Sequence, residues 1–278
     1  MTKFMKIFAA LIALALIAFI LFFANGLVGN PVSKFMANNS AKKYVETNYH
    51  NRDFKVGSAS YNFKSGGYHV AVTSPSSRDT HFSISISMGG KVYNDSYSSV
   101  TSGWNTYYRL ETEYRKLVDT LFKSPNFPIA GEIDFGSIKI AEVELNGGVG
   151  ANYGIDMSTL ILDHEYDIYD IAKEAGEIVF YAVDDVVTIE RASKIILQLR
   201  REFDRANIPF YGLDFVLQKP KTTDKPRPAD EQIYIQGFLY SDIYEEDMEL
   251  RVEKAYHELD EYYKQEDSKR EEKEKIDL

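Results

Sequence analysis

The sequence contains no cysteine among its 278 residues. Disulfides, thiol nucleophiles, cysteine-ligated zinc, covalent haem attachment and a lipidated cysteine are therefore excluded. The Gly-x-Ser-x-Gly nucleophile elbow and the His-Glu-x-x-His zinc helix are also missing, and only five histidines are available as bases. These absences argue against several enzyme classes, and we predict that the chain binds no cofactor.

Basic residues are outnumbered, since 32 Lys and Arg face 42 Asp and Glu and leave a formal net charge of −10. Without Lys3 and Lys6, which precede an apolar run, the rest of the chain has a net charge of −12. Such acidity opposes binding to phosphate backbones and to anionic lipid, so we predict no nucleic-acid partner. Hydrophobic residues make up 44% of the chain and aromatic residues 14%, as expected of a folded protein.

One long apolar run lies near the N-terminus. Every residue from Ile7 to Ala24 is apolar, and the stretch continues to Val28. It reaches the roughly 20 residues that a helix needs to cross a bilayer. A cleaved signal peptide would have an apolar core of about 7 to 15 residues followed by small residues, whereas the bulky Phe22 stands here. We therefore predict a short tail at residues 1–6 and one uncleaved transmembrane helix, Ile7 to Val28, that binds the lipid bilayer.

The side of the membrane on which the rest of the chain lies is weakly encoded by charge. Lys3 and Lys6 on one side of the span face Lys34, Lys42 and Lys43 on the other, and this is nearly a tie under the positive-inside rule. A short N-terminal tail before a signal anchor, together with the absence of cysteine, favours an extracytoplasmic body. We expect a single-pass protein of the cell membrane.

The remaining sequence predicts an α+β protein with two domains. Residues 32–124 fit a helix, an antiparallel meander and a second helix, with the clearest alternation of apolar and polar residues from His81 to Met88. We expect both helices to cover the apolar face of this sheet. The predicted domain boundary lies at Ser124 to Pro128, where turn-forming residues gather.

Residues 127–265 predict a second α+β domain with a mixed or antiparallel sheet, and the charged tail 266–278 predicts disorder. Its most regular helix places apolar residues on one face. The expected elements are strands at Ile133–Leu145, Ile155–Leu162, Glu177–Val183, Tyr211–Leu217 and Ile233–Tyr240, and helices at Ile168–Ala175, Thr188–Ala206 and from about Met248.

Three stretches carry a resemblance to a known family: Ser60-Tyr61-Asn62-Phe63-Lys64, Ser74-Pro75-Ser76-Ser77-Arg78-Asp79-Thr80-His81-Phe82 and Val100-Thr101-Ser102-Gly103-Trp104-Asn105-Thr106. The chain resembles the YfjL-like family of membrane-anchored, Bacillus-type Gram-positive proteins over most of its length. The resemblance implies a location and a domain layout, and it transfers no catalytic residue. The helix, meander and helix are also similar to PepSY-like modules, which regulate peptidases or occur in envelope proteins; this is an analogy of fold.

The polar face of the predicted meander is the candidate binding site. Small hydroxyls and two imidazoles would make it flat and rich in hydrogen-bonding groups, suited to a polar partner or a peptide. The alternative is an ordinary solvated sheet face, or one that the second domain covers. The predicted residues are Ser60, Asn62, His69, Thr73, His81, Ser83, Ser85 and Ser87.

An acidic cluster around His164 is the competing candidate. Asp163, His164 and Asp167 could bind a metal ion, which would make the chain a membrane-tethered metal-dependent hydrolase or peptidase. Acidic residues at the start of a helix also cap its amides and complement its dipole, which is the structural alternative. We predict a non-enzymatic binding or accessory module of the cell envelope whose partner is an envelope protein or a peptide, and the hydrolase is the alternative.

Overall fold

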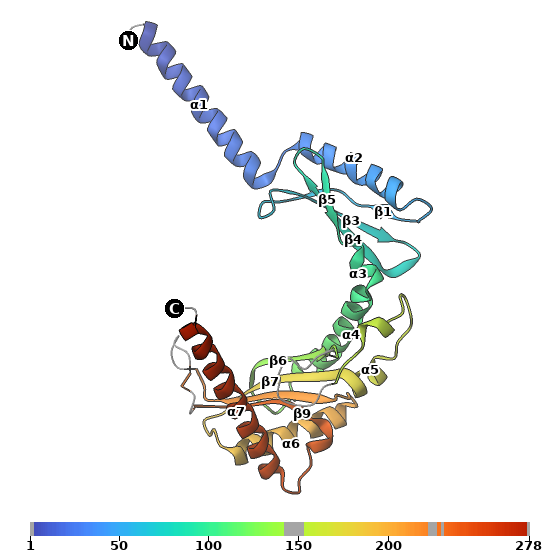
Figure 1. Cartoon of the computed structure of the whole chain (residues 1–278), viewed down its shortest axis with the longest axis vertical. Coiled ribbons are helices and arrows are strands. Elements are labelled where there is room, and N and C mark those ends of the chain that lie inside the picture. Colours follow the sequence, from blue (N-terminus) through green and yellow to red (C-terminus); the bar gives the residue numbers. More distant parts are fainter. Residues whose placement is uncertain (1–2, 142–152, 222–226, 229–230, 277–278) are drawn as a thin grey trace. The chain divides into compact units, whose positions relative to one another are not determined.

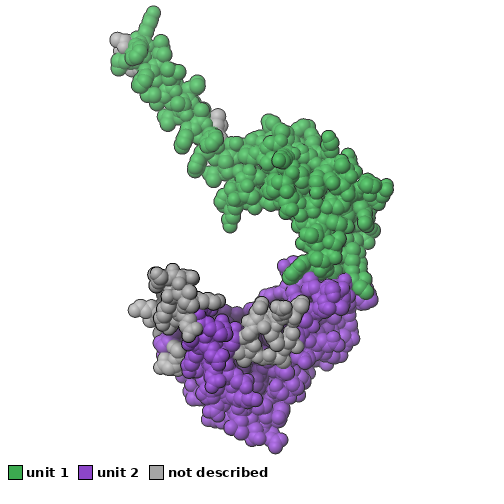
Figure 2. Space-filling view, viewed as in Figure 1, with its two compact units in different colours: residues 1–106, 161–163 green, residues 107–160, 164–278 purple. Residues whose placement is uncertain are grey.

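The computed structural model describes residues 3–141, 153–221, 227–228 and 231–276. The chain divides into two compact units (Figure 2). Unit 1 consists of Met1–Thr106 and Ile161–Asp163, and unit 2 of Tyr107–Leu160 and His164–Leu278. The predicted α+β class is confirmed, with an N-terminal apolar helix, one antiparallel sheet and one mixed sheet.

The apolar helix α1 (Lys3–Val28) contains the predicted span Ile7 to Val28. None of its described side chains is buried, and it is long and apolar enough to cross a membrane. A signal sequence would pass the same test of length and composition. Within unit 1, this helix therefore presents apolar surface on all sides.

The backbone turns between α1 and α2 (Pro31–Asn48). Gly29 has a φ of +71°, and a Cβ atom there would lie 2.6 Å from the Tyr68 hydroxyl, so glycine is required. Asn30 caps α2 by accepting a hydrogen bond from the Ser33 N–H at 2.7 Å. The Tyr68 hydroxyl accepts from the Asn30 N–H at 3.0 Å and donates to the Asn30 carbonyl at 2.9 Å. The start of α2 is thus fastened to the sheet.

The sheet of unit 1 is antiparallel and has the order β1-β3-β4-β5, with β2 also paired to β3. His69 lies opposite Ser85 and Val70 opposite Ile84, so one face is polar and the other apolar. This confirms the predicted meander. Its strands are β1 (Lys55–Val56), β2 (Ser60–Asn62), β3 (Gly67–Ser74), β4 (Ser77–Ser87) and β5 (Val92–Asp95).

The helix α2 packs along the apolar face of this sheet (Figure 1). It does so through a row of small side chains that permits a close approach, namely Ser33, Ala37, Ala41 and Val45. An aromatic cluster fills the far end of the same core, with ring centroids 4.8 to 5.7 Å apart for most pairs. Its members are Tyr49, Phe54, Phe82 and Tyr97.

The sheet of unit 2 is mixed and has the order β6-β7-β8-β9. The central strands β7 and β8 are parallel because α6 (Ile189–Ala206) connects them, and α6 packs on one face of the sheet (Figure 1). Asn207 ends α6 in the left-handed conformation with a φ of 55°. The strands are β6 (Gly131–Ile138), β7 (Gly176–Val183), β8 (Gly212–Gln218) and β9 (Gln232–Leu239).

The helix α4 (Trp104–Phe122) corrects one expectation. It was predicted to cover the first sheet, but Tyr114, Val118 and Phe122 lie in the core of unit 2. Gly136 on β6 allows the contact, because a Cβ atom there would come within 2.5 Å of Val118. The units accordingly divide after Thr106, inside α4, whereas the predicted boundary lies at residues 124–128. A short helix, α3 (Ser98–Thr101), precedes α4.

Two further expectations differ from the structure. The predicted strand Ile155–Leu162 is absent, and the 3-10 turn η1 (Met157–Thr159) stands there because Asp156 accepts hydrogen bonds from the Ser158 N–H and hydroxyl. The predicted strand Ile133–Leu145 ends at Ile138 as β6, and its residues from 142 onward lie outside the described ranges. The predicted helix Ile168–Ala175 is confirmed as α5.

The C-terminal helix α7 (Met248–Ile276) extends well beyond the predicted onset of disorder at residue 266. Its polar end carries ion pairs one turn apart, Lys264 with Asp260 and Lys269 with Glu266. Pairs at this spacing each stabilise a helix by about 0.2–0.5 kcal/mol. The charge pattern that suggested a disordered tail thus also supports a helix.

Gly136→Ala tests the packing of α4 in unit 2. Its added methyl group would overlap Val118, and overpacking of this kind destabilises a core by about 1–3 kcal/mol. Chemical denaturation of the full chain should show this loss, with Ser137→Ala, the next residue on the opposite face of β6, as the matched control. Equal stability of the two variants would contradict the placement of α4.

Candidate functional site

The polar face of the first sheet has the composition predicted from sequence. The register places Ser60 beside His69, His69 opposite Ser85, and Thr73 opposite His81. All eight predicted residues therefore share one face, and the structure adds two neighbours on it, Lys55 and Asn94. Four of the eight are exposed, namely Ser60, Asn62, Thr73 and His81, and the other four are half-buried. Whether this face binds a partner stays a prediction.

Some side chains on this face already form hydrogen bonds within the sheet and its adjoining turn. The His69 ring lies between two hydroxyls, with Ser65 at 3.2 Å from Nε2 and Ser85 at 3.2 Å from Nδ1. Asn62 accepts from a backbone N–H of the adjoining turn. Within the described chain, no hydrogen bond occupies the side chains of Ser60, Thr73 and His81. The Thr73 and His81 pair is therefore the most available part of the face.

The three predicted metal ligands have separate roles. Asp163 accepts a hydrogen bond from the Asp79 N–H at 2.9 Å. The His164 ring packs edge-on against Tyr166 with centroids 4.5 Å apart. Asp167 caps α5, and its carboxylate accepts a hydrogen bond of 2.8 Å from a backbone N–H in the first turn of that helix. Over the described ranges, no group of three or more His, Asp or Glu side chains is arranged to hold a metal ion.

Two of the three stretches that carry the family resemblance meet at a buried hydrogen-bond network in unit 1. The Asp79 carboxylate, in a residue only 1% exposed, accepts from the Thr106 hydroxyl at 2.9 Å and from the Asp163 N–H at 3.1 Å. The Asn105 amide donates to the carbonyls of Asp79 and His81 at 2.8 and 2.6 Å. These residues hold β4 to the start of α4, so we assign them a structural role.

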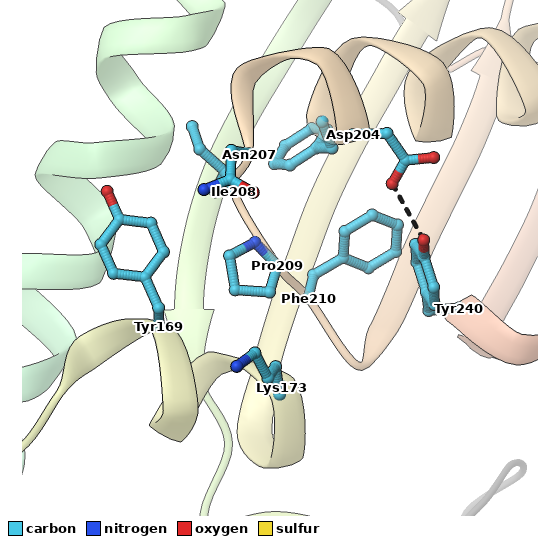
Figure 3. A pocket seen from close by; sticks show the side chains of 9 residues that line it. Tyr169, Lys173, Asp204, Asn207, Ile208, Pro209, Phe210 and Tyr240 are labelled. Atoms are coloured by element: carbon cyan, nitrogen blue, oxygen red, sulfur yellow. Dashed lines mark hydrogen bonds between the residues drawn. The ribbon is translucent and has the colours of Figure 1, made fainter.

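Unit 2 contains a pocket of about 440 Å³ at the C-terminal end of α6 (Figure 3). Because Asn207 adopts the left-handed conformation, the chain turns there and sends Pro209 and Phe210 toward β8. Figure 3 shows Tyr169 on one side of Pro209, and Phe210 and Tyr240 on the other. The pocket thus combines residues from α5, the last turn of α6, the α6–β8 connection and the 3-10 turn η3 (Tyr240–Asp242).

The walls of this pocket are aromatic and its edge carries both charge signs. Phe210 packs edge-on against Tyr240 with centroids 5.1 Å apart, and the Tyr240 hydroxyl donates to Asp204 at 2.9 Å. Lys173 lies beside the pocket and donates to Asp170 at 2.7 Å. Such a site could accept a flat apolar group that carries one polar substituent. Sequence reasoning missed it because α5, the end of α6 and η3 lie far apart in the chain.

A second missed feature is a pair of carboxylates on the face of the unit 2 sheet opposite α6. Glu177 on β7 lies opposite Gly212, two residues from Asp214 on the parallel strand β8. Glu177 accepts from Lys139 Nζ at 3.2 Å and from the Tyr153 hydroxyl at 3.0 Å. Asp214 accepts a hydrogen bond from the Gly237 N–H at 2.7 Å.

Burial, and next to it the charge of Glu177, raises the pKa of Asp214 to about 6, although the bond from Gly237 and the charge of Lys139 act in the opposite direction. Burial beside Glu177 likewise raises the pKa of Tyr153. The sequence signal for this pair was an acidic residue inside an otherwise apolar central strand, Gly212 to Leu217. The pair is a titratable element of the fold.

Comparison with models of protein families tests the resemblance that the sequence suggested. A model of the YfjL-like N-terminal domain matches residues 4–96, and one of the YfjL-like C-terminal domain matches residues 113–253. The chain belongs to the YfjL-like family. No curated protein and no solved structure matches it. The YfjL-like resemblance drawn from sequence is thereby confirmed, and the PepSY-like analogy stays a prediction.

Asp214→Asn should make the stability of this YfjL-like chain less dependent on pH. The pKa of Asp214 is about 6 in the folded state, against an ordinary 3.8, so its favourable contribution is complete below 3.8 and is lost as pH rises through 6. Asparagine keeps the oxygen that accepts from Gly237 and cannot ionise. Relative to wild type, the variant should gain up to roughly 3 kcal/mol between acidic pH and pH 7.

Urea denaturation at a series of pH values would measure this difference. Glu174→Gln, on the exposed side of α5, is the control for the loss of one carboxylate. A constant offset between Asp214→Asn and wild type at every pH would contradict the buried-carboxylate assignment.

Proposed function

We propose that this chain is a single-pass membrane protein of a Gram-positive cell envelope, with both units outside the cytoplasm. It acts by binding a polar segment of another envelope protein, as an accessory or modulator and not as an enzyme. The observation that carries the proposal is the exposed hydroxyl and imidazole face of the first sheet, which belongs to the same unit as α1.

The chemistry of this face favours a polar partner. Ser60, Thr73 and His81 offer donors and acceptors that the described chain leaves unused, so a partner would replace bonds to water and disrupt none within the sheet. Lys55, opposite Thr73, adds a positive charge at the same end. An extended peptide with hydroxyl, amide or carboxylate groups fits such a surface better than an apolar one.

The structural roles of the predicted metal ligands favour a binding function over hydrolysis. Asp163 is bonded to Asp79, and Asp167 caps α5, so both carboxylates have structural duties. Removing either one to test for catalysis would also disturb local structure. We therefore advance no catalytic assignment for His164.

Protease treatment of intact cells tests the predicted sidedness. If both units lie outside the cytoplasm, added protease should digest the chain down to a fragment of α1 without lysis. A cytoplasmic protein of the same cells is the control for membrane integrity. Survival of the full chain until the cells are lysed would overturn the external placement.

A photo-crosslinking amino acid at His81 tests the binding face. In intact cells, the probe should form a discrete adduct in the membrane fraction, because His81 is exposed at the most available part of the face. Adding Ser83→Arg and Ser85→Arg should abolish the adduct by placing bulk and charge on the neighbouring surface.

The matched control is the same probe at Thr47, which is exposed on α2, on the other side of the first sheet. An adduct of equal yield at Thr47, or one that persists in the arginine variant, would contradict specific binding by the serine-rich face.

A further inference from the structure

The first turns of α2 place large apolar residues on the outside. Val32 is 69% exposed, Phe35 65% and Met36 40%, whereas the side chains that face the sheet are small. A helix on a soluble domain normally does the reverse and buries its large apolar residues. The outward residues follow the end of α1 by four to eight positions, so they stay near that helix.

Two turns of the sheet lie at the same end of unit 1. Asn62 pairs with Gly67, and Gly67 with Ser87, so the β2–β3 and β4–β5 turns are neighbours. The first turn carries Phe63, which is 61% exposed. In the second, a Cβ atom on Gly90 would lie 3.3 Å from Met36, so this turn adjoins α2.

The joint with α1 is at this end as well. The Tyr61 hydroxyl donates to the Gly26 carbonyl at 2.7 Å, and Tyr68 holds Asn30. Exposed aromatic and aliphatic residues therefore lie at the end of the sheet where α1 joins the rest of unit 1. We call this region the α1-proximal end, defined by Val32, Lys34, Phe35, Phe63, Lys64 and Lys91.

The charge of this end is opposite to that of the chain as a whole. Residues 30–106 include eight basic and four acidic residues, whereas residues 107–278 include 22 basic and 38 acidic ones. No Asp or Glu occurs in residues 1–45, 54–78 or 80–94, which contain the whole α1-proximal end. The negative net charge, which argues against binding to anionic lipid, therefore arises in residues 107–278.

We propose that the α1-proximal end docks on the surface of an anionic bilayer, with Phe35 and Phe63 in the interfacial layer and Lys34, Lys64 and Lys91 against the lipid headgroups. The inference rests on the proposed membrane anchor. Apolar side chains beside basic ones are the composition that binds such interfaces, and each lysine near an anionic surface contributes about a fivefold gain in affinity. The occupant is the membrane from which α1 emerges.

The absence of cysteine allows a direct test with single-cysteine variants of the full chain. Phe35→Cys and Phe63→Cys, each labelled with an environment-sensitive fluorophore, are reconstituted in phosphatidylcholine vesicles with or without phosphatidylglycerol. Nitroxide lipids with a shallow spin label serve as the quencher. Both labels should be quenched and blue-shifted in the anionic vesicles, because these exposed side chains would enter the interface.

Two further labelled positions supply the controls. Ser76→Cys, in the turn at the opposite end of the same sheet, should stay unquenched, and Leu14→Cys, within α1, should be quenched by deep nitroxides. Changing Lys34, Lys64 and Lys91 together to Gln should lower the docked-to-undocked ratio by about fivefold per lysine.

The outcomes separate docking from anchoring. If Leu14→Cys is quenched while Phe35→Cys and Phe63→Cys behave like Ser76→Cys, the anchor stands and the docking proposal is overturned. If Leu14→Cys is not quenched, the anchor itself falls, and the docking proposal with it. Equal quenching in both lipid mixtures, unchanged by the lysine substitutions, would overturn the role of the lysines.

Discussion

The two hydrogen bonds between Tyr68 and Asn30 determine the organisation of unit 1. They fasten the start of α2 to β3, and Gly29 makes the necessary turn with a φ that other residues rarely adopt. Tyr68 must point to the apolar side of the sheet to make these bonds. Since side chains alternate along a strand, the next residue, His69, points to the opposite side with Ser85. The covered face and the exposed polar face thus follow from the same constraint.

The close packing of α2 on the sheet explains why this helix exposes its large apolar residues. The helix approaches the sheet closely through Ala37 and Ala41, which leaves no room beneath it for larger side chains. Phe35 and Val32 must therefore lie outside the core, near the end of α1. In a soluble domain this arrangement would expose apolar surface at a cost, whereas at a membrane surface it contributes to binding.

Periodicity predicted the elements whose burial is one-sided. The alternation from His81 to Met88 identified β4 and its polar face, and the apolar stripe of residues 188–206 identified α6, because each faces a single core. The same reasoning could not say which core α4 joins. That depends on Gly136, whose missing side chain admits Val118, and a glycine in a strand does not reveal its partner.

The same distinction between local periodicity and long-range contacts applies to the candidate sites. The serine-rich face was accessible to sequence reasoning because its residues lie on a regular meander, where a period of two places them together. The pocket beside Tyr240 was not, since Tyr169, Phe210 and Tyr240 come from elements far apart in the chain. Asp214 was missed because its raised pKa depends on burial and on Glu177 across the parallel strand pair. Local patterns do not encode such environments.

The direction of the strands connects the two proposed surfaces. The turns at Phe63 and Gly90 lie at the α1-proximal end, and the β3–β4 turn lies at the other, so the polar face extends from one end of unit 1 toward the other. From Ser87 to His81, this spans six residues, or about 20 Å at the rise of a strand. If the α1-proximal end rests on the bilayer, Thr73 and His81 lie at the end of the face farther from it. A partner bound there would be held above the lipid headgroups, where a polar segment remains in water.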